Sequence, residues 1–246
     1  MENRYYLYGT VKTNEAVSLG PTNLSTTGVP DEIKVHVSNG LGLAYVMHAS
    51  DEDEVAATRK NLVTHQKVVE RLMEHYGVVV PFAFGTLFNS LEEVEKLLEE
   101  RRDAFLEMFE KIEGKVELTL KMMWEKMDPV FAEIVEENEE ISVKRSLVVD
   151  GQAQQNDQIE LGKLVEEALL QKKEKLCQEV IAPLIEIAVD HRIQKNITEA
   201  MFVNVNFLVK KEDESRFDEA INAVGEAYQH NVLVKYIGPA APVNFL

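Results

Sequence analysis

The order of secondary-structure elements in this sequence predicts an α+β protein. Residues 1–114 show the patterns of three strands, a helix, a short strand and a second helix. Residues 115–246 show strand, helix, strand, helix, strand, an order that suits a ferredoxin-like sheet with helices on one face. A length of 246 residues with 45% hydrophobic side chains is enough for one large domain or two small ones.

The N-terminal strands are recognised by their composition. Aromatic and β-branched residues predict a strand over 5–11, and the Thr, Ser, Asn, Gly and Pro content of 12–30 predicts a loop. Two further strands, 33–37 and 43–47, flank a turn at 39–40 and are predicted to form a hairpin.

A helix is predicted over 55–76, with Ser50 or Asp51 as its cap. Apolar residues recur every seven positions on one face, at Val55, Leu62, Val69 and Tyr76. His65 falls on this same face. We expect a hydrogen-bonded core histidine there, the alternative being a ligand-binding one.

The uncharged run 77–88 between two charged helical segments is the central feature of the sequence. It is too short to cross a bilayer, which needs about 20 apolar residues. We expect a short buried strand at 78–80 that ends at Pro81, followed by a turn at Gly85. The turn presents Phe82, Phe84 and Phe88, which either plug the core or form a patch that contacts a partner.

The remaining elements follow from periodicity. Ser90 and Glu93 form the capping pattern of a helix that runs to Gly114. Strands are predicted at 116–124, 202–209 and 232–237, and helices at 129–135, 159–192 with a kink near Pro183, and 217–228. The mixed, polar stretch 141–158 predicts a mobile loop.

Charge and cysteine content limit the partners. The chain has 43 acidic and 26 basic residues, a formal net charge of -17, so nucleic acid and anionic membranes are unexpected partners. The single cysteine, Cys177, excludes an internal disulfide and a multi-cysteine metal site. Without a recognisable secretory signal, we expect a location in the cytoplasm.

The sequence offers little support for catalysis. Phosphate-binding loops, zinc-protease motifs and serine-hydrolase elbows are not found. Cys177 lies among lysines that would lower a thiol pKa, but a packing role in its helix is the simpler interpretation. The alternative function is a ferredoxin-like haem-dependent enzyme with His191, near the end of the long helix, as axial ligand. We expect no catalytic site, metal or cofactor.

Four segments together resemble the gas vesicle protein F/L family (GvpF/GvpL). They are residues 6–9 (YLYG), 65–70 (HQKVVE), 81–88 (PFAFGTLF) and 238–245 (GPAAPVNF), in the family's order and over nearly the whole chain. The resemblance implies two domains, an unusual α/β N-terminal domain over 1–114 and a ferredoxin-like C-terminal domain over 115–246. Ala83 departs from the family, many members of which carry an arginine there.

The resemblance also implies a function. Family members are minor components that help to assemble or line the gas vesicle shell, so the expected partners are the hydrophobic shell subunit, gas vesicle protein A, and other accessory proteins. The expected location is the vesicle shell. The Phe-rich turn and the apolar tail from Ile237 to Leu246 would supply the contact area, since aromatic residues dominate the energetics of interfaces. The predicted partner-binding residues in these two segments are Phe82, Phe84, Gly85, Thr86, Phe88, Gly238, Pro239 and Phe245.

Overall fold

The computed structural model describes residues 3–22, 31–38, 40–49, 54–151, 154–228 and 230–246. The chain divides into two compact units. Unit 1 consists of Met1–Glu117 and Pro239–Leu246, and unit 2 consists of Leu118–Gly238. The sequence predicted a second domain over all of 115–246, whereas Pro239–Leu246 is grouped with unit 1, where Ala241 is part of the hydrophobic core.

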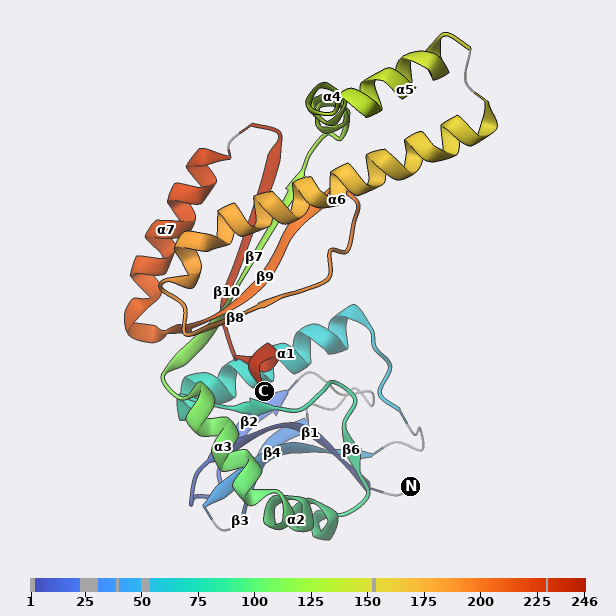
Figure 1. The fold of residues 1–246 in the computed structure, drawn as a ribbon. Helices are drawn as coiled ribbons and strands as arrows, with labels where there is room; N and C mark the ends of the chain where they lie inside the picture. The colour runs from blue at the N-terminus through green and yellow to red at the C-terminus, as the bar shows by residue number, and fades with distance from the viewer. Residues whose placement is uncertain (1–2, 23–30, 39, 50–53, 152–153, 229) are drawn as a thin grey trace. The chain divides into compact units, whose positions relative to one another are not determined.

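Unit 1 contains an antiparallel sheet (Figure 1). Its strands are β1 Asn3–Lys12, β2 Ser18–Thr22, β3 Asp31–Ser38, β4 Leu41–Ala49, β5 Val80–Pro81 and β6 Leu87–Phe88. The strand order is β2-β3-β4-β1-β5, and β6 also pairs with β1. The hairpin of β3 and β4 is confirmed. The prediction of a loop over 12–30 was wrong at β2. Gly20 and Pro21 argue against a strand in the sequence, but proline is tolerated in an edge strand such as β2.

Three helices cover the two faces of this sheet: α1 Arg59–Tyr76, α2 Leu91–Glu100 and α3 Arg102–Ile112. The predicted caps of α1, Ser50 and Asp51, lie outside the described residues; Thr58 caps the helix instead, and its hydroxyl accepts a hydrogen bond from Asn61 N at 3.2 Å. The single helix expected up to Gly114 is two helices that meet at Arg101.

Strand β1 separates two layers of core. Alternate side chains of a strand point to opposite faces. Tyr6 and Tyr8 pack with the α1 layer, and Leu7 packs with the α2 and α3 layer. All three side chains are fully buried. Unit 1 therefore depends on a central strand that has no solvent-facing side at these positions.

Unit 2 has the ferredoxin-like arrangement. Its strands are β7 Lys115–Trp124, β8 Asp190–Ile193, β9 Met201–Lys210 and β10 Val232–Ala240, and its helices are α4 Asp128–Glu137, α5 Glu139–Val149, α6 Gln155–Ile185 and α7 Glu214–Ala227. The sheet order β10-β7-β9-β8 is that of a split βαβ fold, with α6 and α7 on one face (Figure 1). The predicted α+β class is confirmed, with β8 as an additional strand.

The expected mobile loop at 141–158 is mostly helical. Helix α5 occupies its first part, and α6 begins at Gln155. Ile141 is the buried residue of α5, and Lys144 forms an ion pair with Glu160 of α6 at 2.8 Å. Because the buried face of α5 is so narrow, its apolar residues do not recur with a clear helical spacing. The sequence of this segment therefore resembles that of a loop.

Gly9 of β1 lets β5 approach closely. A Cβ atom at this position would lie 2.7 Å from Cγ2 of Val79 and 3.1 Å from the carbonyl oxygen of Val80. The second distance is to backbone, so the clash cannot be relieved by a side-chain rotation alone. Any larger residue must displace β5, which leads directly into the Phe82 turn.

We therefore expect Gly9→Ala to destabilise unit 1 by about 1–3 kcal/mol, the usual cost of overpacking. Thermal unfolding followed by circular dichroism measures this. The control is Gly162→Ala, in the middle of α6, where an added Cβ meets nothing within 4 Å; there alanine raises helix propensity, and stability rises by up to about 1 kcal/mol. Equal melting temperatures for wild type and Gly9→Ala would contradict the prediction.

Candidate functional site

The Phe82 turn is attached to β1 by backbone hydrogen bonds on both sides. Phe82 N donates to the carbonyl oxygen of Tyr8 at 2.9 Å, and Leu7 N donates to that of Thr86 at 3.0 Å. Within the turn, the Thr86 hydroxyl donates to the carbonyl oxygen of Ala83 at 2.7 Å. Gly85 has a φ of 89°, a conformation that favours glycine. These bonds give the turn a defined shape.

A chain of side-chain hydrogen bonds links the same turn to α1. Tyr6 Oη lies 2.7 Å from Nδ1 of His65, and Nε2 of His65 lies 3.2 Å from the carbonyl oxygen of Phe82. Gly85 N donates to Tyr6 Oη at 3.3 Å. All contacts are satisfied by a neutral imidazole whose Nε2–H donates to Phe82 while Nδ1 accepts from the tyrosine hydroxyl. His65 is thus the hydrogen-bonded core histidine that the sequence predicted.

Burial determines the charge of these groups. Burial lowers the pKa of His65, and the hydrogen bond to the Phe82 carbonyl opposes this shift in part. Burial likewise raises the pKa of Tyr6 to about 12, against the effect of the Gly85 N–H. The ring of Phe84 packs edge-on against both, with ring centroids 6.1 Å from Tyr6 and 5.8 Å from His65. The cluster is neutral at physiological pH.

The C-terminal segment is anchored beside this cluster. Phe245 is fully buried, and Ala241 is a member of the α1-side core. The carboxylate of Glu117, itself buried, accepts from Asn244 N at 3.0 Å and from Asn244 Nδ2 at 2.5 Å. A buried carboxylate that accepts two hydrogen bonds holds its partner firmly.

Helix α1, the turn and the C-terminal segment together enclose an apolar pocket of about 200 Å³. Its lining residues are His65, Gln66, Val69, Glu70, Pro81, Phe82, Ala240, Ala241 and Val243. At the mouth, Gln66 donates to Glu70 at 3.0 Å, and Val243 is 49% exposed. A cavity of ~150 Å³ is enough to bind benzene, so this pocket fits one large apolar side chain.

The predicted partner-binding residues take different positions. Phe82 lines the pocket. Phe84 packs on the α1-side core and Phe88 on the other core layer. Gly85 and Thr86 shape the turn, Gly238 and Pro239 are exposed, and Phe245 is buried. Sequence reasoning missed Gln66, Val69, Glu70, Pro81, Ala240, Ala241 and Val243 as pocket residues. The available signals were the apolar tail and the motif at residues 65–70 of α1.

Two other candidate residues lie in unit 2. His191 belongs to strand β8 rather than to the end of the long helix, so the helical haem ligand was wrongly placed. Cys177 is buried and burial raises the pKa of its thiol, in agreement with a packing role. Among the described residues, no cluster of three or more His, Cys, Asp or Glu side chains is arranged to bind a metal. Nor does any described helix have the length and hydropathy needed to span a membrane.

The fold and the pocket define an α+β protein with a ferredoxin-like unit and an apolar pocket in its other unit. A family model described as gas vesicle synthesis protein GvpL/GvpF matches residues 4–246. The chain belongs to this family, as its sequence motifs suggested.

Individual relatives agree over the full length. Gas vesicle protein F of Dolichospermum flosaquae is 26% identical over 98% of this chain and 96% of that protein. Gas vesicle protein L1 of Halobacterium salinarum is 23% identical over 100% of this chain and 91% of that protein. The crystal structure of GvpF from Anabaena sp. PCC7120 has a similar fold, with a TM-score of 0.85, 24% identity, and coverage of 99% of this chain and 98% of that one.

Removing the tyrosine hydroxyl tests the hydrogen-bond chain. We expect Tyr6→Phe to lower the free energy of unfolding by about 1–3 kcal/mol, because it leaves buried groups of His65 and Gly85 without a partner. Hydrogen exchange measured by mass spectrometry should become faster in the peptide that contains residues 82–88. Tyr228→Phe, at the end of α7, serves as control. Unchanged exchange in Tyr6→Phe would show that the hydroxyl does not hold the turn.

The lowered pKa of His65 predicts a pH dependence. The unfolded chain takes up a proton near the ordinary value of 6.5, whereas the folded chain does so only at lower pH. The contribution to stability is therefore complete above about pH 6.5 and decreases as the pH falls below it. Denaturant unfolding from about pH 7.5 to about pH 5.5 measures the slope.

His65→Gln should flatten this slope, since glutamine does not titrate. His75→Gln, at the exposed end of the same helix, should leave the slope as in wild type. Identical slopes in all three proteins would mean that another group controls stability in this range.

Proposed function

We propose that this chain is a gas vesicle accessory protein that binds the hydrophobic shell subunit, gas vesicle protein A, by accepting one of its apolar side chains in the pocket beside Phe82. Association with gas vesicles follows from the family. The choice of partner and site is our proposal, and the pocket between α1, the turn and the tail is the observation that supports it. The protein then acts at the shell, during its assembly or as a lining component.

The pocket has the chemistry that such a contact needs. Its walls at Val69, Pro81 and Ala241 are apolar, and His65 is held neutral by burial. A hydrophobic side chain that enters gains about 1.5–3 kcal/mol from leaving water. Hydrogen bonds already hold Phe82 and His65, two residues that line the pocket, in place before a partner binds. Binding therefore does not have to order this part of the pocket.

Around the pocket, the predicted residues take supporting positions. We propose that Phe82 contacts the partner directly, that Phe84, Gly85, Thr86 and Phe88 keep the turn in shape, and that Phe245 holds the tail. Gly238 and Pro239 are exposed and extend the contact surface. Other accessory gas vesicle proteins with an exposed apolar side chain are partners of the same kind.

We propose a non-catalytic role. The haem alternative rested on a histidine at the end of a helix, but His191 lies on an edge strand, where its ring stacks on Phe207 at a centroid distance of 6.4 Å. This contact supports a packing role for the histidine. An absorption spectrum after haem addition tests the alternative directly, and a Soret band that His191→Ala removes would support it.

Two substitutions at the pocket test the binding proposal. Val243→Asp places a charge at the half-exposed rim, and Ala240→Leu fills the cavity without charge. We expect each to weaken retention of co-expressed gas vesicle protein A by about ten- to a hundredfold, since the entering side chain is excluded. A quantitative pull-down measures retention.

Val149→Asp is the matched control, because Val149 is 74% exposed on α5 and does not line the pocket. It adds the same charge without blocking the site. Circular dichroism confirms that all variants fold. If Val243→Asp and Ala240→Leu both retain the shell subunit as well as wild type, the pocket is not its binding site.

A further inference from the structure

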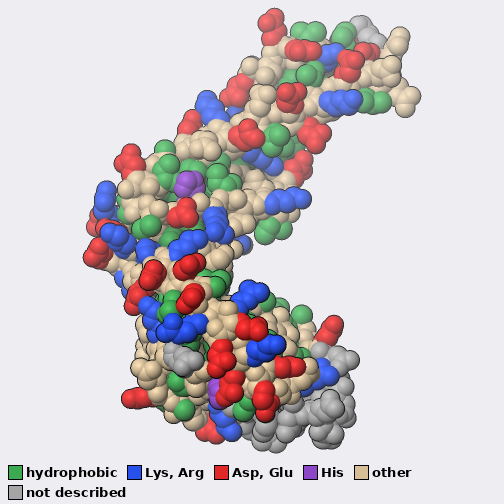
Figure 2. All heavy atoms as spheres, turned by 60° about the horizontal axis from the view of Figure 1, so that its bottom comes forward, with side chains coloured by type: hydrophobic (Ala, Val, Ile, Leu, Met, Phe, Trp, Pro, Cys, Tyr) green, Lys and Arg blue, Asp and Glu red, His purple; other side chains and the backbone are tan. Residues whose placement is uncertain are grey.

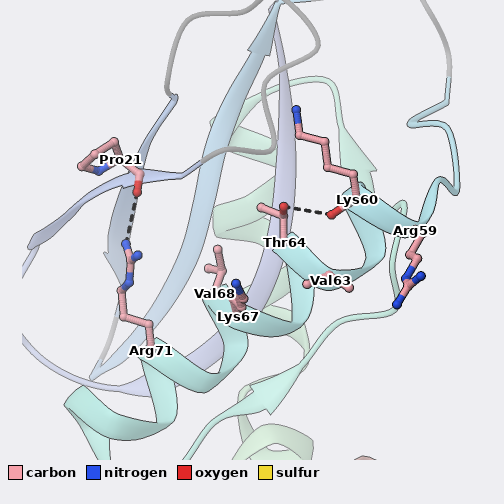
Figure 3. Close-up of a pocket in the computed structure, with 8 residues that line it drawn as sticks. All are labelled: Pro21, Arg59, Lys60, Val63, Thr64, Lys67, Val68 and Arg71. Carbon is pink, nitrogen blue, oxygen red and sulfur yellow. Dashed lines mark hydrogen bonds between the residues drawn. The ribbon is translucent and has the colours of Figure 1, made fainter.

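Helix α1 carries a concentration of positive charge in a strongly acidic chain. Four of its exposed residues, Arg59, Lys60, Lys67 and Arg71, line one open pocket of about 600 Å³. The other lining residues are Pro21, Val63, Thr64 and Val68 (Figure 3). We call this set the basic surface. None of the described residues that line it carries a carboxylate, whereas acidic side chains are distributed over both units on the face seen in Figure 2.

The basic surface is linear. Arg59, Val63, Lys67 and Arg71 recur every four residues, so they lie along one side of the helix. Twelve residues of helix cover about 18 Å. This length matches a bound helix or strand better than a single small anion, which requires donors that converge on one point.

One end of the surface is fixed. Arg71 Nη1 donates to the carbonyl oxygen of Pro21 at 3.2 Å (Figure 3) and to that of Leu19 at 3.3 Å, which ties the guanidinium to β2. A guanidinium has five N–H donors, so it retains others for a carboxylate. The α1 side chains that line the pocket between these cations are apolar or neutral. Val68 is buried and Val63 is 43% exposed.

The cations of this surface are available. Among the described residues, no ion pair involves Arg59, Lys60 or Lys67. The net charge of -17 opposes binding of a nucleic acid or an anionic membrane. A short acidic segment experiences mainly the local field, because screening limits charge interactions to about 8–10 Å.

From the charge and the linear geometry, we propose that the basic surface binds an acidic amphipathic helix of a partner protein. Carboxylates one turn apart would face Arg59, Lys67 and Arg71, and an apolar side chain between them would cover Val63. The partner need not be the shell subunit, and this contact is separate from the pocket at Phe82.

Fluorescence anisotropy with a synthetic probe tests the proposal on the full chain. The probe is a labelled alanine-rich helical peptide with glutamates one turn apart and one leucine, and its twin carries glutamine in place of glutamate. We expect the glutamate peptide to bind about tenfold more tightly than the twin at low ionic strength, and more weakly as salt is added.

Arg59→Gln, Lys60→Gln and Lys67→Gln combined should weaken the glutamate peptide about tenfold. Lys163→Gln, Lys175→Gln and Lys235→Gln combined remove the same number of charges from exposed positions elsewhere and should have little effect. Arg71 is left intact because it also holds β2. Val243→Asp should bind the peptide normally, which separates this surface from the shell-binding proposal.

Four outcomes would overturn the proposal. Equal binding of the two peptides would show that the carboxylates do not contribute to binding. Equal loss in the two triple variants would reduce the effect to nonspecific charge. Binding of inorganic phosphate without binding of the glutamate peptide would indicate a small-anion site. Self-association in analytical ultracentrifugation that only the α1 triple variant abolishes would assign the surface to a second copy of this chain.

Discussion

Unit 1 depends on the hydrogen bond between the hydroxyl of Tyr6 and the imidazole of His65. This contact joins residues 59 positions apart and links β1 to α1, while the same two side chains bind both ends of the Phe82 turn. Because the groups are buried, a missing partner costs more than the hydrogen bond itself contributes. His65 and Phe82 are also walls of the apolar pocket, so the interaction that specifies the packing of the core also determines the shape of the site.

Strong hydrophobic patterns made the larger elements predictable. Strands β1 and β9 are rich in β-branched or aromatic residues, and β7 alternates apolar and polar residues. Helices α1 and α7 repeat apolar residues on one buried face, although Leu62 of α1, which the sequence placed on that face, is 45% exposed. The missed elements lack such patterns. The residues of β8 are mostly exposed, β2 contains Gly20 and Pro21, and Ile141 is the buried residue of α5. Their conformation comes from pairing or packing with distant segments, which a local pattern does not report.

The candidate site was predictable in part for the same reason. An uncharged run such as 77–88 is conspicuous in a charged chain, and the apolar tail is too. The sequence does not indicate how deeply each apolar side chain is buried. Phe245 is fully buried, whereas nearby Val243 is 49% exposed. Asn244, which lies between these two residues, is held by Glu117, 127 positions away. Long-range contacts of this kind decide which apolar residues become core and which line a pocket.

Helix α1 has two chemically opposite sides. His65 and Val69 face the apolar pocket, and Lys60 and Lys67 lie on the basic surface. At 3.6 residues per turn, Lys67 is roughly 200° around the helix from His65, so the two surfaces cannot be used by one small contact. The bonds of His65 and Arg71 fix the rotation of the helix from both sides. The acidic chain otherwise repels acidic partners, so a positive surface held in a fixed orientation restricts where such a partner can bind. Charge complementarity of this kind contributes to specificity more than to affinity.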